Sequence, residues 1–102
     1  MHAVLITFHS TAPLDEVVAA FTGHAPALRA SPGLVTLTWL QDGAMLGGFH
    51  LFADRPSADA YLDSTLLAEV TANPAFSRFQ LAHFGVLEGL SRLTGLPREA
   101  AA

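Results

Sequence analysis

The sequence contains no cysteine and no lysine, and charged residues make up only 14% of its 102 positions. Without cysteine the chain cannot form disulfides, iron–sulfur clusters, thiolate nucleophiles or structural zinc sites built from cysteine. Its basic residues are scattered arginines and its net charge is −4, so it lacks the basic patch that nucleic-acid binding requires. No apolar run reaches the roughly 20 residues of a membrane span. We therefore expect neither a nucleic-acid partner nor a membrane partner.

What the chain does contain is a large apolar fraction, 51% of its residues. Its length predicts one domain over residues 1–102, with the alanine-rich stretch 97–102 as a disordered tail. A strand-like run follows Met-His-Ala at once, without the charged region or cleavage site of a signal peptide, which predicts a cytoplasmic protein. A small domain with so many apolar residues is expected to bury part of its surface against another subunit.

Hydrophobic periodicity predicts the element order β-α-β-β-α-β. The expected strands are 2–9, 34–41, 44–53 and 78–87, and the expected helices are 14–30, 56–70 and a short terminal one at 88–96. Asp42-Gly43 is a strong hairpin signal between the two central strands. This order predicts an α+β, ferredoxin-like fold: a four-stranded antiparallel sheet in the order 4-1-3-2 with two helices on one face.

Strand pairing predicts which side chains share a face of this sheet. A two-residue turn at Asp42-Gly43 would place Gln41 opposite Ala44 and, further along, Val35 opposite His50. Matching apolar residues between the first and third strands pairs Val4 with Leu51. The face toward the helices would then carry Val4, Ile6, Phe8, Phe49, Leu51, Phe84 and Val86. The face without helices would carry Leu5, Thr7, His9, Val35, Leu37, Trp39, Gly48, His50, Phe52, Leu81, His83 and Gly85.

The predicted face without helices is too apolar to be exposed to water, although it carries three histidines and a tryptophan. The simplest arrangement that covers it is a symmetric homodimer in which two sheets pack into an α+β barrel. Such a barrel would enclose a partly polar cavity for a small molecule, with Gly48 and Gly85 leaving room in it.

The chain resembles the dimeric α+β barrel superfamily, and within it the YdhR-like mono-oxygenases, relatives of the antibiotic-biosynthesis mono-oxygenases. The motifs that carry the resemblance cover nearly the whole chain: Ser31-Pro32-Gly33-Leu34, Trp39, Gly47-Gly48-Phe49-His50-Leu51-Phe52-Ala53-Asp54, Ser57-Ala58-Asp59-Ala60-Tyr61-Leu62, Phe84-Gly85-Val86 and Glu88-Gly89-Leu90-Ser91. The resemblance implies oxygenation of aromatic or polyketide-like compounds without metal or flavin. Haem-degrading relatives use an asparagine, a tryptophan and a helical histidine; helix 56–70 has no histidine, which argues against haem.

His50 is the strongest candidate for a catalytic residue, because it is predicted in mid-strand on the face without helices. An imidazole with an ordinary pKa of about 6.5 can remove a proton from a phenol or an acidic C–H group. Dioxygen can attack the resulting electron-rich carbanion without a cofactor. A buried histidine that only binds the backbone or a ligand is the alternative.

His83 is a second candidate for catalysis, with ligand binding or a dimer contact as its alternative. Trp39 is expected either to stack on a flat ligand or to pack at the dimer interface. Tyr61 is expected in the core with its hydroxyl bonded to a partner. Further candidates for the ligand-binding wall are Thr7, His9, Phe52 and Leu37.

The histidines are not spaced as metal ligands. In the predicted register Leu5 lies between His50 and His83, and two strand spacings of about 4.8 Å are too wide for one ion with bonds near 2 Å. No HxH, HExxH, GxGxxG or Walker pattern occurs either. We therefore expect no metal and no cofactor.

The family resemblance implies a cofactor-independent mono-oxygenase that acts on an aromatic or polyketide-like small molecule, with His50 as its base. The same base in the same cavity would also serve a non-redox cyclase or isomerase. A protein that binds a small molecule without turnover is the third possibility.

Overall fold

The computed structural model describes residues 1–96, in which strands and helices alternate along the chain. Their bounds are β1 His2–Ser10, α1 Leu14–Arg29, β2 Leu34–Asp42, β3 Met45–Phe52, α2 Arg55–Leu62, α3 Thr65–Thr71, β4 Phe76–Gly85 and α4 Glu88–Arg92. The predicted tail at 97–102 lies outside the described residues. Within the described part, no helix is both long enough and apolar enough to cross a membrane.

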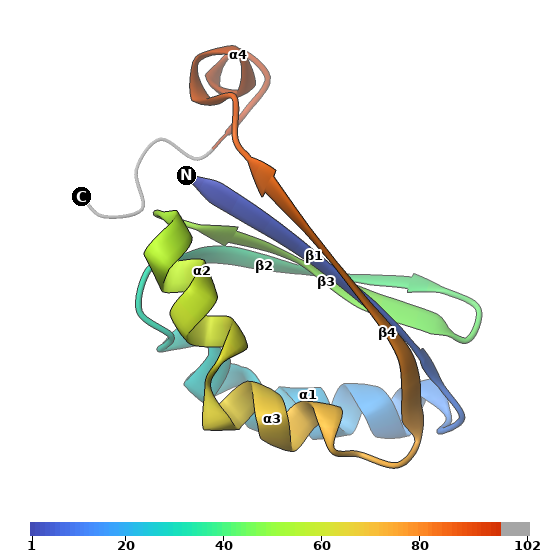
Figure 1. Ribbon diagram of the computed structural model, residues 1–102. Helices are drawn as coiled ribbons and strands as arrows, with labels where there is room; N and C mark the ends of the chain where they lie inside the picture. The colour runs from blue at the N-terminus through green and yellow to red at the C-terminus, as the bar shows by residue number, and fades with distance from the viewer. Residues whose placement is uncertain (97–102) are drawn as a thin grey trace.

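The strands form one antiparallel sheet in the order β2-β3-β1-β4. Helices α1, α2 and α3 all lie on the same side of this sheet, and α4 stands beyond the end of β4 (Figure 1). The ferredoxin-like α+β fold and the strand order predicted from the sequence are therefore confirmed.

The helix predicted at 56–70 is two helices, because a second cap interrupts it. Asp54 caps α2 by accepting a hydrogen bond from the Ser57 backbone N–H at 2.8 Å. The Ser64 hydroxyl then accepts from the Leu67 backbone N–H at 3.2 Å and starts α3. The chain bends between α2 and α3 (Figure 1).

The core lies between the sheet and these helices, in two apolar clusters. One cluster joins Val4, Ile6 and Phe52 of the sheet to residues of α1 and α2: Leu28, Ala58 and Tyr61. The other, at the opposite end of the sheet, consists of Phe8, Val17, Leu46 and Phe76. Helix α1 contributes to both clusters and so spans the length of the core.

The predicted pairing of β1 with β3 is wrong by one residue. Val4 lies opposite His50, not Leu51, and Leu5 lies opposite Phe49. A one-residue shift moves every side chain of the strand to the other face. His50 and Phe52 therefore lie under the helices, whereas Phe49 and Leu51 lie on the uncovered face.

The pairing of β2 with β3 differs from the prediction by two residues, which preserves the facing. The turn is Gly43-Ala44, with Gly43 at φ 61°, so that Asp42 pairs with Met45 and Leu37 with His50. Trp39 and Leu37 consequently share the face of His50, as predicted, but that face is the one that the helices cover. Val35 lies at an irregularity of the pairing and is not opposite His50.

On β4 the predicted facing is reversed as well. Phe84 pairs with Ala3 and His83 with Val4, so Phe84 lies on the uncovered face, where it is 52% exposed. The uncovered face mixes polar and apolar side chains. Its members are Ala3, Leu5, Thr7, His9, Thr36, Thr38, Leu40, Met45, Phe49, Leu51, Gln80, Ala82 and Phe84.

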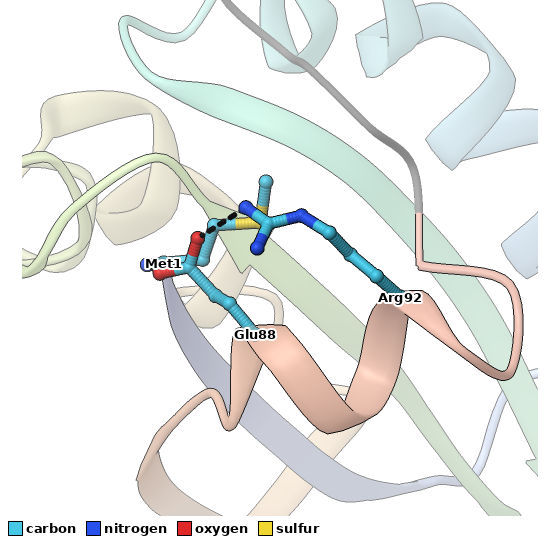
Figure 2. Close-up of polar contacts among 3 residues, drawn as sticks. All are labelled: Met1, Glu88 and Arg92. Atoms are coloured by element: carbon cyan, nitrogen blue, oxygen red, sulfur yellow. Dashed lines mark hydrogen bonds and ion pairs between the residues drawn. The ribbon is translucent and has the colours of Figure 1, made fainter.

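Helix α4 is attached to the rest of the fold by charge. The amino group of Met1 pairs with one carboxylate oxygen of Glu88, and Arg92 donates to the other at 3.1 Å, as Figure 2 shows. The leucines at and within its first turn, in contrast, are exposed: Leu87, the N-cap residue, is 72% and Leu90 64% exposed. The described chain thus has unburied apolar surface both on the open sheet face and on α4.

Candidate functional site

His50 lies at the centre of the layer between sheet and helices, with only 4% of its surface exposed. Its Nδ1 atom is 3.2 Å from the Val4 carbonyl oxygen and 3.1 Å from that of Gly48. Its Nε2 atom is 3.1 Å from the Tyr61 hydroxyl oxygen on α2. Gly48 makes room for the ring, since a Cβ there would lie 3.0 Å from His50 Cε1.

These partners determine the tautomer of His50. Carbonyl oxygens only accept hydrogen bonds, so Nδ1 must carry the proton and donate it. Nε2 of the neutral ring is then an acceptor, and Tyr61 donates its O–H to it. His50 and Tyr61 therefore form a buried pair through which one proton can pass from oxygen to nitrogen.

Burial acts on both members of this pair. Loss of solvation lowers the pKa of His50, partly offset by the two backbone carbonyls. Burial raises the pKa of Tyr61 to about 12. At neutral pH His50 is therefore an uncharged base and Tyr61 an uncharged donor, which is the state in which the pair can accept a proton.

A cavity of about 430 Å³, which we call the outer cavity, lies between α1 and the β2–β3 end of the sheet. Its walls are apolar and aromatic, apart from the polar side chains of Thr22 and Gln41. No charged side chain lines it. The lining residues are Phe8, Leu14, Val18, Phe21, Thr22, Ala25, Trp39, Leu40, Gln41, Leu46 and Gly47. The outer cavity is therefore suited to an uncharged, flat molecule.

A second space of about 30 Å³, which we call the inner hollow, lies beside His50 and Tyr61. It shares Phe8, Phe21 and Trp39 with the outer cavity. Trp39 packs against Phe21 with ring centroids 4.7 Å apart and also borders a third space of about 170 Å³. A ligand in the outer cavity would therefore touch the same aromatic rings that border the His50–Tyr61 pair.

The structure brings together only part of the predicted site. Phe52 stacks on His50 with ring centroids 6.1 Å apart, and Leu37 packs against the same core cluster. Thr7 and His9 lie on the uncovered face, on the other side of the sheet. Because Trp39 and His50 lie beneath the helices, the predicted cavity between two sheets that contains them is wrong.

His83 is separated from the His50 pair and contacts another histidine. Its Nδ1 atom is 2.8 Å from Nε2 of His2. Burial, followed by the nearby positive charge of Arg55, lowers the pKa of His2. Among residues 1–96 no group of three histidine or acidic side chains is arranged to hold a metal ion.

Sequence reasoning missed the contribution of α1 to the cavity wall. Phe21 of α1 was not among the predicted site residues, yet its ring packs against Trp39, Phe8 and Phe76. Tyr61 was expected in the core with a bonded hydroxyl, and the structure identifies its partner as His50. The useful signal was the single tyrosine on the apolar side of a helix, since a buried hydroxyl needs a partner.

The lowered pKa of His50 predicts that acid destabilises the fold. In the unfolded chain the His50 imidazole binds a proton below about pH 6.5, whereas burial opposes its protonation in the folded protein. The contribution of His50 to the free energy of unfolding is therefore fully present above that pH and is lost progressively as the pH falls below it. We expect the free energy of unfolding to fall by up to about 1.4 kcal/mol per pH unit for this residue. Urea titrations between about pH 7.5 and pH 5.5 would measure the slope. His50→Gln should show a shallower slope, and an unchanged slope would contradict the assignment.

Comparison with known proteins agrees with this architecture. The family described as "Putative mono-oxygenase ydhR" matches residues 4–97. A search of curated proteins found no significant match. Several solved structures share the fold at low sequence identity, as expected for a scaffold that hosts several activities.

Three of these structures illustrate the range of activities. A protein of unknown function from Nitrosomonas europaea, NE2512, is 23% identical, with a TM-score of 0.71 over 84% of this chain and 88% of its own. SnoaB, a cofactor-independent oxygenase from Streptomyces nogalater, is 19% identical, with a TM-score of 0.69 over 83% and 91%. The haem degrader MhuD from Mycobacterium tuberculosis is 17% identical, with a TM-score of 0.66 over 85% and 96%.

Proposed function

Because the chain belongs to the ydhR family of putative mono-oxygenases, we propose that it oxygenates a flat, apolar carbon acid bound in the outer cavity. The observation that carries this proposal is the neutral His50–Tyr61 pair, buried next to an uncharged aromatic cavity. Neither a metal nor an organic cofactor is needed, because the substrate itself supplies the electrons. The substrates that fit are aromatic or polyketide-like compounds with an acidic CH₂ group.

The proposed reaction uses the pair as a relay. The substrate loses a C–H proton to the Tyr61 oxygen while Tyr61 passes its own proton to His50 Nε2. The carbanion that remains transfers electrons to dioxygen and forms a C–O bond. The resulting peroxide takes the stored proton back and then loses water, so that CH₂ and O₂ become C=O and H₂O.

Trp39 and Phe21 would orient the substrate, since their rings line the outer cavity and pack against each other. Stacking of a flat ligand on these rings would fix its plane relative to Tyr61. His83 has no place in this scheme, because its ring is hydrogen-bonded to His2. It becomes a matched control for substitutions of His50.

We further propose that the uncovered sheet face packs against a second copy of the chain. Phe84, Met45 and Phe49 on this face are each at least 39% exposed. Large apolar side chains left exposed on a small domain are typical of a subunit interface. In such a homodimer the outer cavity stays within each protomer, under its own α1.

Oxygen uptake with an anthrone, a flat carbon acid, would test the proposed reaction. We expect one dioxygen to be consumed per substrate, and labelled dioxygen to place one oxygen atom in the product and the other in water. His83→Ala should keep this activity. A product of unchanged oxidation state would instead indicate a cyclase or isomerase, and binding without turnover would indicate a binding protein. Either result would contradict the proposal.

A further inference from the structure

We propose that Arg29 and the third space form a subsite for an anionic group, so that the preferred ligand is a flat aromatic compound that carries a carboxylate. This inference rests on the proposed oxygenase function, because it describes the substrate of the same site. The third space shares Ala25 and Trp39 with the outer cavity. A ligand that extends from the outer cavity past these two side chains therefore reaches Arg29, which lines the third space.

One stripe of α1 connects the two spaces. Val18, Thr22 and Ala25 line the outer cavity, and Ala25 and Arg29 line the third space. These residues follow one another at intervals of three or four positions, the spacing of side chains on one face of a helix. The distance along the helix axis from Thr22 to Arg29 is about 10 Å. A compound of two or three fused rings with an acidic side chain can span both spaces.

Among the described residues that line the outer cavity, the inner hollow and the third space, Arg29 is the only one with a charged side chain. A guanidinium presents its N–H donors in a planar fork that matches the two oxygens of a carboxylate. The uncharged ring system of the ligand would occupy the outer cavity, and its charge would lie outside that cavity, at Arg29. Arg29 is thus the group that would distinguish an anionic ligand from a neutral one.

None of the ion pairs within residues 1–96 involves Arg29. The arginines of α2 and α4, in contrast, each bind a carboxylate four positions away on their own helix. Four positions from Arg29 the sequence has Ala25 and Gly33, which have no carboxylate. The last turn of α1 suits a cation because of the helix dipole, but the dipole supplies no acceptor for the guanidinium. A ligand carboxylate would supply one.

The subsite would also orient the substrate. A ligand held at Arg29 would lie along α1 and against Trp39, which borders both spaces. Its other end would then lie in the outer cavity, whose Phe8 also borders the space beside the His50–Tyr61 pair. The carboxylate would therefore determine which end of the ring system faces the base.

Isothermal titration calorimetry with anthraquinone-2-carboxylate and its neutral carboxamide would test the subsite. Both compounds are flat and unreactive, and they differ by one negative charge. We expect the wild-type protein to bind the carboxylate about fivefold more tightly, a modest factor because Arg29 is exposed to water. This preference should shrink in about 1 M salt, which screens interactions between charges.

Arg29→Gln should bind both compounds with the affinity of the carboxamide, whereas Arg29→Lys should keep part of the preference because it retains the charge. Arg78→Gln serves as the control, since it removes the same charge from an exposed position of β4 that lines none of the three spaces. It should behave like the wild type. A wild-type protein without the preference, or an Arg29→Gln variant that keeps it, would overturn the proposal.

In oxygen-uptake assays Arg29→Gln should lower kcat/KM about fivefold for an anthrone that carries a carboxylate and should leave kcat/KM for an uncharged anthrone unchanged. An equal effect on both anthrones would contradict the subsite. If no anthrone supported oxygen uptake while calorimetry showed the preference for the carboxylate, the oxygenase function would fail and the anionic subsite would stand.

Discussion

Replacing His50 with alanine should abolish oxygen uptake, with a loss of at least about 100-fold, and should lower the free energy of unfolding by about 2–4 kcal/mol. The activity falls because the relay loses its final proton acceptor. The stability falls because a cavity opens beside Phe52 and the buried Tyr61 hydroxyl loses its acceptor. Oxygen-electrode assays and urea unfolding would measure the two effects.

Two further variants separate the effect of His50 on turnover from its effect on stability. His50→Gln can donate to the Val4 and Gly48 carbonyls and accept from Tyr61, but it cannot hold a proton, so it should be nearly as inactive and considerably more stable. Tyr61→Phe removes one hydroxyl and should cost about 1 kcal/mol while stopping turnover. Wild-type activity in His50→Ala would remove His50 from the mechanism.

A second substitution is expected to disrupt the proposed homodimer. Phe49→Glu should convert a dimer into monomers, raising the dimer dissociation constant by at least about 100-fold. Phe49 lies in a central strand on the uncovered sheet face and is 39% exposed in the single chain. By two-fold symmetry the substitution would bury two carboxylates in one interface, at a cost of several kcal/mol. Sedimentation velocity across a range of concentrations would measure it.

Leu14→Glu offers a matched control, since Leu14 is 47% exposed but belongs to α1 on the other side of the sheet. It should leave the dimer intact. A wild-type protein that sediments as a monomer at micromolar concentration, or a Phe49→Glu variant that remains dimeric, would contradict the proposed interface.

The element order and fold could be predicted because local signals agreed with one another. Asp42-Gly43 marked the central hairpin, and runs of β-branched and aromatic residues marked the strands. Each of these signals depends on residues within a few positions of each other. The break at Ser64 was missed because a cap inside a continuous apolar stripe resembles an ordinary polar position of a helix.

The facing of the sheet could not be predicted from the same signals. Strand β3 has apolar residues at both odd and even positions, Leu46 and Phe52 on one face and Phe49 and Leu51 on the other, so its pattern fits either register. In the register that forms, His50 of β3 is hydrogen-bonded to Tyr61 of α2, a contact between elements that local signals do not reveal. The cavity was missed for a related reason, since its volume depends on how α1 is placed over the sheet.

The position of Trp39 has a practical consequence. It is the only tryptophan in the chain, and it borders the outer cavity, the inner hollow and the third space of about 170 Å³. Trp39 is 47% exposed. A guest entering the outer cavity should displace water from the ring and shift its fluorescence to shorter wavelength. The protein thus carries a built-in, label-free optical reporter of occupancy.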